Sequence, residues 1–352
     1  MKPMNLRKTV MSILAGATML AGAGVAQAAD ITLKVSHYLP PSHGFQVDFL
    51  ENWGKQLSEK TNGKVEVQIF DATSAFGKID RQADQVRAGV MDMAVGLNGI
   101  PRDRYPAASV IEMPFLVKYA DSGSETLWQL YKEGLLGSDY QDFKVLGLFT
   151  HEGGLIHTLD TPVKSLDDLK GLRLRTPSPA ISAMLESFGA SPVGLPPSAI
   201  YENLQKGNIE GLVTTWDLVN AVKANELLKY HTDAAAYTAG FYFVMNQKKY
   251  DSLPEDVRAA IDEISGDALV GKFGDWWTKW EAVGKAAAEE RGNEIIVIDD
   301  ATRAEWQSSV QPMIKDYLES LKEKGVADPE AIYKRAQELV AEFDAKYHAG
   351  DK

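Results

Sequence analysis

The chain of 352 residues contains no cysteine and carries a formal net charge of −12, with 49 acidic and 37 basic side chains. The lack of cysteine excludes a disulfide framework and a lipid-modified thiol, so stability must come from a hydrophobic core. The negative charge argues against nucleic acid and anionic membrane surfaces as partners. It does not argue against an anionic ligand, because a nearby arginine sets the field inside a cleft.

Residues 1 to 28 have the pattern of a secretory signal peptide. Three basic residues precede an apolar run over 11–25, and Ala26-Gln27-Ala28 supplies small residues at a cleavage site. We expect an exported mature chain that begins near Ala29, and the loss of the three basic residues would change the net charge from −12 to −15. No later stretch approaches the roughly 18 apolar residues of a membrane span, so we expect a protein that is not embedded in a membrane.

Strands and helices should alternate in the first half of the mature chain. Alternating apolar residues predict strands at 31–35 and 65–69, with a helix over about 47–57 between them. A helix near 79–86 then leads to a buried strand at 91–95. These β-α-β units predict an α/β fold.

The second half repeats this alternation and ends in helices. The predicted extended segments are 145–158, 172–176, 191–195, 211–216, 241–245 and 295–298. The predicted helices are 165–168, 179–188, 198–206, 254–291, 302–323 and 329–347. The helix over 254–291 is unusually long for a globular domain and could span two domains.

Arg175 is the candidate anion-binding residue. Leu172 and Leu174 alternate with Arg173 and Arg175 as in a short strand, and Pro177 ends that strand. An arginine at a strand end offers a planar, bidentate donor to a carboxylate, which lysine would reproduce less well. On the local pattern alone, a solvated basic strand end is the alternative.

A helix should begin directly after this strand. Ser178 is a plausible N-cap and Pro179 occupies the favoured first helical position. Free backbone N–H groups at a helix N-terminus attract anions. We therefore expect this helix terminus to face the same carboxylate as Arg175.

The sequence lacks recognisable motifs for catalysis, nucleotide binding or metal binding. His151 and His157 are six residues apart rather than four, and Gly153-Gly154 would break the helix needed to place both on a zinc ion. We expect no enzyme, no metal and no cofactor. A periplasmic hydrolase is the alternative class, and it would need a nucleophile, a base or a metal in the cleft.

Several aromatic residues lie near predicted strand ends. Trp216 follows Thr214-Thr215, while Tyr237, Phe241 and Tyr242 precede or enter another strand. Each of them could be an ordinary core residue. Together with one arginine they would suit a cleft for an apolar or aromatic acid.

The order of motifs resembles the solute-binding component of tripartite ATP-independent periplasmic (TRAP) transporters, the DctP-like family, over nearly the whole mature chain. These motifs are Gly77 to Gly89 followed by Met91-Asp-Met-Ala-Val, Arg104-Tyr-Pro-Ala-Ala-Ser-Val-Ile-Glu-Met-Pro-Phe-Leu116, Leu169-Lys-Gly-Leu-Arg-Leu-Arg-Thr-Pro177, Gly189-Ala-Ser-Pro-Val193, Tyr201 to Gly211, and Phe243-Val-Met-Asn246. In that family the second arginine of the Gly-Leu-(Lys/Arg)-x-Arg-x-Pro motif binds the ligand carboxylate. The matching residue is Arg175.

The resemblance implies a two-domain periplasmic-binding-protein fold of the α/β class (type II-like), with hinge strands and a long domain-spanning helix. The implied parts are a first lobe over 29–153 plus about 242–265, a second lobe over 154–241 plus about 290–300, a bracing helix over 254–291, and C-terminal helices over 302–352. Hinge closure would trap the ligand, and the small and large membrane subunits would recognise the closed state. An ion gradient would supply the energy, and we expect a monomer.

Two departures from the family narrow the expected ligand. Members that bind sialic acid carry a further arginine upstream, which the segment 152–158 lacks, and an asparagine where this chain has Thr214-Thr215-Trp216. The segment 150–158 is also similar to a branch that binds aromatic and indolic acids. We expect a monocarboxylate with an apolar or aromatic body, and the alternatives are a small hydroxy or keto acid and a C4-dicarboxylate. A protein that reports ligand to a sensor would have nearly the same sequence.

The expected ligand contacts are Arg175, Trp216, Thr215, Thr214, Tyr237, His37, Asn98 and Glu152.

Overall fold

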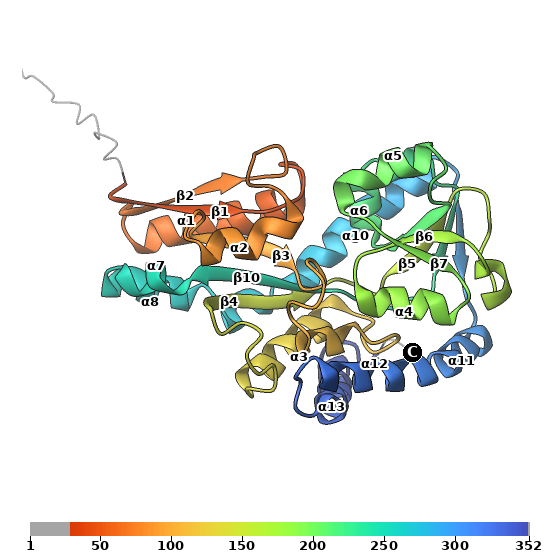
Figure 1. The fold of residues 1–352 in the computed structure, drawn as a ribbon. Coiled ribbons are helices and arrows are strands. Elements are labelled where there is room, and N and C mark those ends of the chain that lie inside the picture. The colour runs from red at the N-terminus through yellow and green to blue at the C-terminus, as the bar shows by residue number, and fades with distance from the viewer. Residues whose placement is uncertain (1–28, 351–352) are drawn as a thin grey trace, which may run out of the picture.

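The computed structural model describes residues 29–350, and the predicted signal peptide lies outside this range. Two β-sheets stand side by side, each covered by helices (Figure 1). We call the part around the sheet with β1 the first lobe and the part around the other sheet the second lobe. The predicted two-domain α/β fold is confirmed.

The first sheet has the strand order β2-β1-β3-β10-β4. Its strands are β1 (Ile31–Ser36), β2 (Val65–Phe70), β3 (Met93–Leu97), β4 (Phe143–Thr150) and β10 (Gly240–Asn246). The first three strands run parallel, and β10 is antiparallel to both β3 and β4. The aromatic strand late in the sequence therefore completes the first lobe.

The second sheet has the order β11-β9-β5-β8-β6-β7. Its strands are β5 (Leu155–Thr158), β6 (Arg173–Thr176), β7 (Ser191–Gly194), β8 (Gly211–Thr214), β9 (Tyr230–Asp233) and β11 (Glu294–Val297). The strand that carries Arg175 lies between β7 and β8 and is parallel to both. Neighbouring strands thus hold its backbone on both sides.

Helices and short 3-10 or π turns cover the sheets and close the chain. The helices are α1 (Glu51–Lys60), α2 (Gln82–Arg87), α3 (Ala120–Lys132), α4 (Pro179–Ser187), α5 (Ile200–Gln205), α6 (Trp216–Ala221), α7 (Gln247–Ser252), α8 (Glu255–Glu263), α9 (Asp267–Val270), α10 (Phe273–Glu290), α11 (Asp300–Ser309), α12 (Gln311–Glu323) and α13 (Pro329–Tyr347). The turns are η1 (Phe45–Leu50), η2 (Ile79–Arg81), η3 (Ala108–Glu112), η4 (Leu166–Leu169), η5 (Pro197–Ala199) and η6 (Ala224–Glu226).

Three segments cross between the lobes. Residues 151–154 link β4 to β5, and residues 234–239 link β9 to β10. These two crossings pair with each other, since the Gly154 N–H donates to the Tyr237 carbonyl over 2.7 Å and the Ala236 N–H donates to the Gly154 carbonyl over 3.2 Å. The third crossing is α10, which runs from the first lobe into the second and contacts both α3 and α6 (Figure 1).

Local signals correctly predicted several helix starts. Ser165 forms a capping box with Asp168 at the start of η4, and the Ser178 hydroxyl accepts the Ile181 N–H over 3.4 Å at the start of α4. These caps satisfy N–H groups that have no partner within the helix, so they act without help from distant residues. The predicted helix over 329–347 has the same bounds as α13.

The long helix predicted over 254–291 is wrong as a single element. It is divided into α8, α9 and α10. Gly266 has a left-handed backbone with φ of 59°, and its N–H donates to the Leu146 carbonyl of β4 over 2.7 Å, which turns the chain out of the helix. Only α10 keeps the expected role of spanning both lobes.

Two further boundaries differ from the prediction. Trp216 starts α6 rather than ending a strand, because the Glu281 carboxylate of α10 accepts the backbone N–H groups of Trp216 and Asp217 over 2.9 and 3.0 Å. The helix predicted over 302–323 is divided at Val310, just before Pro312, whose nitrogen has no hydrogen to donate.

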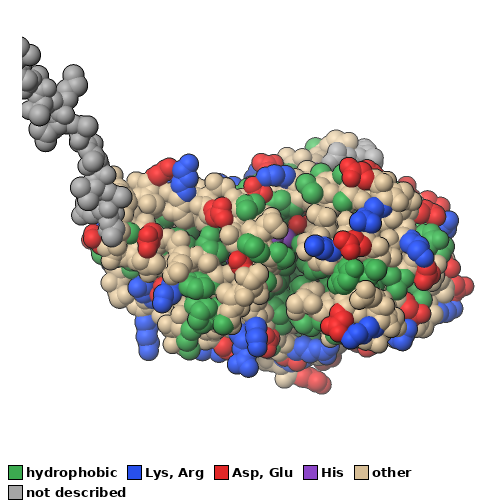
Figure 2. Space-filling model, turned by 90° about the horizontal axis from the view of Figure 1, so that it is seen from above, with side chains coloured by type: hydrophobic (Ala, Val, Ile, Leu, Met, Phe, Trp, Pro, Cys, Tyr) green, Lys and Arg blue, Asp and Glu red, His purple; other side chains and the backbone are tan. Residues whose placement is uncertain are grey.

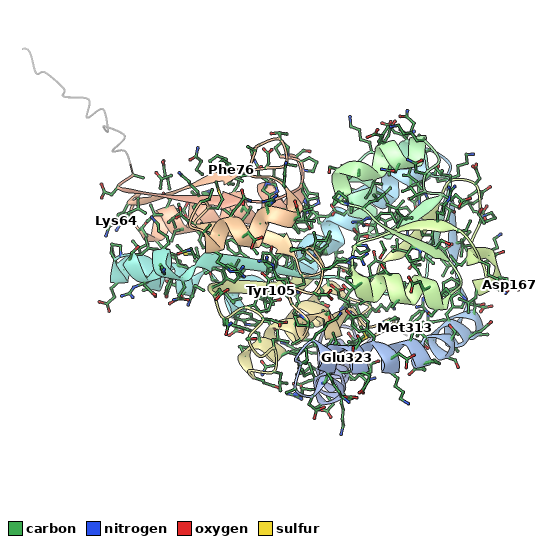
Figure 3. All side chains as sticks on the ribbon, in the orientation of Figure 1. Lys64, Phe76, Tyr105, Asp167, Met313 and Glu323 are labelled. Carbon is green, nitrogen blue, oxygen red and sulfur yellow. The ribbon has the colours of Figure 1, made fainter. Side chains whose placement is uncertain are left out.

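The C-terminal helices connect the two lobes from outside. Helix α12 packs against α4 of the second lobe, while α13 packs against α3 and η3 of the first. Met313 on α12 packs against the hydrophobic core, and Figure 3 shows it where α12 passes α4. Lys64 and Asp167 in the same view mark opposite ends of the molecule.

Charged side chains of both signs are interspersed on the surface, as Figure 2 shows for one face. Within residues 29–350, no helix combines the length and the apolar character that crossing a bilayer requires.

Candidate ligand-binding site

A small cavity, with about 40 Å³ open to the centre of a water molecule, lies between the two lobes. Its wall consists of Tyr38, Leu39, Phe45, Leu97, His151, Arg175, Pro177, Pro197, Thr214, Thr215, Asp217, Leu218, Tyr237, Ala239, Phe241 and Trp277. All of these except Leu218 are buried. Because both lobes and the crossing segments contribute to the wall, the protein is in a closed conformation.

Arg175 is the only arginine in this wall, and its side chain is 1% exposed. Its Nε donates to the Leu195 carbonyl over 2.9 Å, which fixes the guanidinium plane. Burial lowers the pKa of Arg175 to about 10, so the group stays charged at neutral pH. Among the described residues, no carboxylate forms an ion pair with it. A buried cation without a counter-charge is costly, and an anionic ligand would supply that charge.

Four hydroxyl groups share the wall with Arg175. They belong to Tyr38, Tyr237, Thr214 and Thr215. Burial raises the pKa of both tyrosines well above the ordinary value, and the nearby arginine only partly offsets this effect. The phenols are therefore neutral and can donate hydrogen bonds beside the guanidinium.

The α4 terminus does not reach this wall, contrary to our expectation. Pro177 lines the cavity, but no residue of α4 does in the part of the chain that the structure describes. The nearest helix start is instead that of α6, where Thr215 is the N-cap and accepts the Leu218 N–H over 3.4 Å. The side chains of Thr215 and Asp217 face the cavity there.

An aromatic group forms the apolar part of the wall. Phe45, Phe241 and Trp277 contact one another with ring centroids 5.7, 5.8 and 6.1 Å apart. Phe45 lies in η1, Phe241 in β10 and Trp277 in α10. Their edge-to-face and tilted contacts leave apolar surface toward the cavity, which suits a flat ring.

Asp217 brings a second charged group into the wall. Its Oδ2 lies 2.8 Å from Nε2 of His43, a buried histidine of the first lobe. Nδ1 of His43 accepts the Phe45 N–H over 3.0 Å, so Nε2 carries the hydrogen and donates it to Asp217. This hydrogen bond joins the two lobes across the cavity.

Four of the eight expected contact residues lie in the cavity wall, namely Arg175, Thr214, Thr215 and Tyr237. The other four are buried or half-buried elsewhere. Trp216 packs against His157 and His231 with centroids 5.2 and 4.6 Å apart. Trp216 begins α6, and its ring lies against His157 of β5 and His231 of β9 rather than in the cavity wall.

His37, Asn98 and Glu152 each serve a local contact instead. Nε2 of His37 is 3.3 Å from Oε1 of Gln46, and Oδ1 of Asn98 accepts the Tyr140 hydroxyl over 2.9 Å. Oε2 of Glu152 accepts the Ala120 N–H at the start of α3 over 3.1 Å. Burial raises the pKa of Glu152 to about 7.

Sequence reasoning missed several wall residues, including Tyr38, Phe45, His151, Asp217 and Trp277. The sequence gives a partial indication for two of them. His151 is next to Glu152, and Asp217 follows Trp216, and both of these neighbours are predicted ligand contacts. Phe45 and Trp277 reach the cavity only through packing between η1 and α10. No cluster of three potential metal-binding side chains occurs within residues 29–350.

Comparison with known proteins places this geometry in a family. Residues 35–321 match the family model described as bacterial extracellular solute-binding protein, family 7 (DctP). The chain is 27% identical over 347 residues to the outer membrane transporter protein TsaT of Comamonas testosteroni, with 95% of this chain and 98% of TsaT covered.

Two solved structures are also similar. One is a TRAP solute-binding protein specific for aromatic acid ligands from a marine metagenome, in complex with 3-hydroxybenzoate (32% identity, TM-score 0.86, 90% of this chain and 100% of that chain covered). The other is a TRAP solute-binding protein from Rhodoferax ferrireducens T118 in complex with copurified benzoate (30% identity, TM-score 0.85, 90% and 99% covered). The chain therefore belongs to family 7 of the bacterial extracellular solute-binding proteins, the DctP-type binding subunits of TRAP transporters.

Proposed function

We propose that this protein captures an aromatic monocarboxylate in the periplasm and delivers it to the membrane subunits of a TRAP transporter. The observation that carries this proposal is the buried Arg175 guanidinium, which forms no ion pair within residues 29–350 and lies in a closed cavity with an aromatic wall. A ligand carboxylate would pair with both Nη1 and Nη2, while Nε stays bonded to the Leu195 carbonyl.

The wall favours an aromatic body for this acid. Phe45, Phe241 and Trp277 offer three rings to one ligand, and ring-to-ring contacts prefer such edge-to-face geometry. The two similar structures with aromatic acids support the same ligand class. Tyr38 and Tyr237 would add hydrogen bonds to the carboxylate beside Arg175.

A dicarboxylate fits this cavity less well. The wall contains one arginine and also the Asp217 carboxylate, so a second anionic group on the ligand would meet repulsion rather than a partner. A C4-dicarboxylate would need a second group of hydrogen-bond donors, away from Arg175, for its other carboxylate.

Transport would follow from closure around the ligand. A ligand that contacts both lobes binds the closed conformation more tightly and so raises its population, which the membrane subunits would recognise. The mature chain would begin near Ala29, act as a monomer and need neither a cofactor nor a catalytic step. The known relatives are binding proteins rather than enzymes.

A ligand screen with one substitution tests the proposal. Aromatic monocarboxylates should raise the melting temperature of the mature protein more than keto acids, dicarboxylates or sugar acids do, because they bind only the folded state. Arg175→Lys should weaken their binding at least about tenfold, since lysine cannot reproduce the bidentate contact.

Arg173→Lys is the matched control. Arg173 lies on the same strand but is exposed and pairs with Glu210 over 3.2 Å, so its replacement should leave affinity unchanged. Equal affinities in the Arg175→Lys variant and the wild type, or a melting temperature that no aromatic acid raises, would contradict the proposed function.

A further inference from the structure

His151 lies at the junction of the two lobes, directly after β4, and its side chain is 5% exposed. It belongs to the cavity wall, where its ring contacts Tyr237, Phe241 and Trp277 with centroids 5.3, 6.0 and 5.9 Å away. A polar ring therefore lies inside the aromatic part of the wall.

Local hydrogen bonds determine which nitrogen of His151 carries the hydrogen. Nδ1 contacts the backbone carbonyl oxygen of Glu152, which can only accept. The Thr238 hydroxyl, 3.5 Å from Nδ1, donates its own hydrogen to the His151 carbonyl over 2.7 Å. Nδ1 is thus the donor. Burial lowers the pKa of His151 to about 4, so the ring is neutral at neutral pH and Nε2 presents a lone pair.

Nε2 of His151 has no hydrogen-bond partner among residues 29–350. This nitrogen is not among the unpartnered polar atoms that are sealed from solvent, so it faces open space, and His151 lines the cavity. Asp217, which also lines the wall, receives the His43 N–H on Oδ2. The cavity therefore offers an unused acceptor in its aromatic part, separate from the donors around Arg175.

We propose, building on the function proposed above, that the bound acid carries a hydrogen-bond donor on its aromatic ring and that Nε2 of His151 accepts this hydrogen. The donor is a phenolic hydroxyl or an indole-type N–H. His151 is then a specificity-determining residue, which separates hydroxylated or indolic acids from aromatic acids without a donor.

Calorimetric titration of the wild-type protein tests this inference with pairs of ligands. The first pairs are 3- and 4-hydroxybenzoate against 3- and 4-fluorobenzoate, because fluorine has nearly the size of a hydroxyl but donates no hydrogen. The second pair is indole-3-acetate against 1-methylindole-3-acetate. At least one donor should bind about tenfold or more tightly than its matched partner, and the pair that does so identifies the donor. A preference below twofold in every pair would overturn the inference.

Substitution then assigns the preference to His151. In His151→Phe the preference for the ligand with a donor should fall to within about twofold. The affinity for the ligand without a donor should change much less than the affinity for its partner. His151→Gln retains an acceptor of similar reach and should keep part of the preference. His37→Phe removes a buried histidine outside the cavity wall and should keep all of it.

The outcomes separate this inference from the proposed function. Aromatic acids that bind through Arg175 without any preference for a donor would overturn the role of His151 and leave the proposed function intact. An equal loss of affinity for both ligands of a pair in His151→Phe would indicate a merely structural role. If that variant does not fold, the wild-type comparison still decides.

Discussion

Asp217 places a carboxylate in the same cavity wall as Arg175, and its replacement by asparagine tests how the site excludes a second negative charge. Asp217→Asn removes the charge but keeps an oxygen that can accept the His43 N–H. We expect the affinity for isophthalate relative to benzoate to rise about tenfold, or about 1.4 kcal/mol, as measured by calorimetry.

A surface substitution controls for the loss of one negative charge. Asp167 is exposed at the far end of the second lobe (Figure 3). Asp167→Asn should therefore leave the ratio of the affinities for isophthalate and benzoate unchanged. A ratio that is the same in Asp217→Asn and in the wild type would show that the carboxylate does not select against dianions.

Glu112 should make stability depend on pH. Burial raises the pKa of this carboxyl from 4.5 to about 7, while its Oε1 accepts the Gly240 N–H over 3.2 Å. Between these values the folded protein holds a proton that the unfolded chain releases, so stability falls as the pH rises. In urea unfolding between pH 5 and 7, Glu112→Gln should remove up to about 1.4 kcal/mol per pH unit of this loss.

Other acids with a raised pKa remain in the variant and serve as an internal reference. Asp139 and Glu152 also have pKa values raised to about 7 by burial, so some loss of stability with pH should persist. Identical slopes for the wild type and Glu112→Gln would mean that Glu112 is ionised in the folded protein.

At the scale of elements, the contact between α10 and α6 positions one side of the cavity. Gly284 of α10 lies so close to α6 that a Cβ atom there would be 2.2 Å from the Trp216 carbonyl oxygen. Gly284→Ala should therefore push the helices apart and reduce the free energy of unfolding by about 1–3 kcal/mol. Ligand affinity should fall as well, because the first turn of α6 carries Asp217, and Thr215 caps it.

The neighbouring residue provides the control for this prediction. Val283 is 57% exposed on the same helix, and Val283→Ala should change stability by no more than about 0.5 kcal/mol. Chemical unfolding and calorimetry measure both effects. A Gly284→Ala protein as stable as the wild type would show that the two helices can separate without cost.

Elements with their own local signals were predictable, and those that depend on distant partners were not. The strand with Arg175 and the start of α4 follow from alternation and from Ser178 and Pro179. The break between α8 and α9 depends on the bond from Gly266 to the Leu146 carbonyl, 120 residues away, which no local pattern reveals.

At the scale of the whole molecule, the bond between His43 and Asp217 joins the lobes in the closed conformation. His43→Asn should remove this bond, because asparagine is too short to reach Asp217, yet it can still accept the Phe45 N–H as histidine does. A bond made only in the closed state favours closure, so its loss should weaken binding of every ligand by a common factor of about ten or more.

Stopped-flow and scattering measurements check this prediction. The dissociation rate of each ligand should rise by a similar factor, and the ligand-bound variant should scatter as a more open particle than the wild type. Changes that affect one ligand and spare another would instead assign His43 to ligand selection. His43→Gln, which keeps a donor of longer reach, should restore part of the affinity.

The alternation of strands and helices, the strand end at Arg175 and the family motifs can be recognised in the sequence, because each depends on residues that are close along the chain. The set of side chains that meet in the cavity depends instead on how distant segments pack together. Tyr38, Phe45, His151, Asp217 and Trp277 are spread over more than half the chain, and their directions depend on packing between lobes. Sequence patterns report which face of an element is apolar, whereas a cavity between lobes arises where several such faces meet.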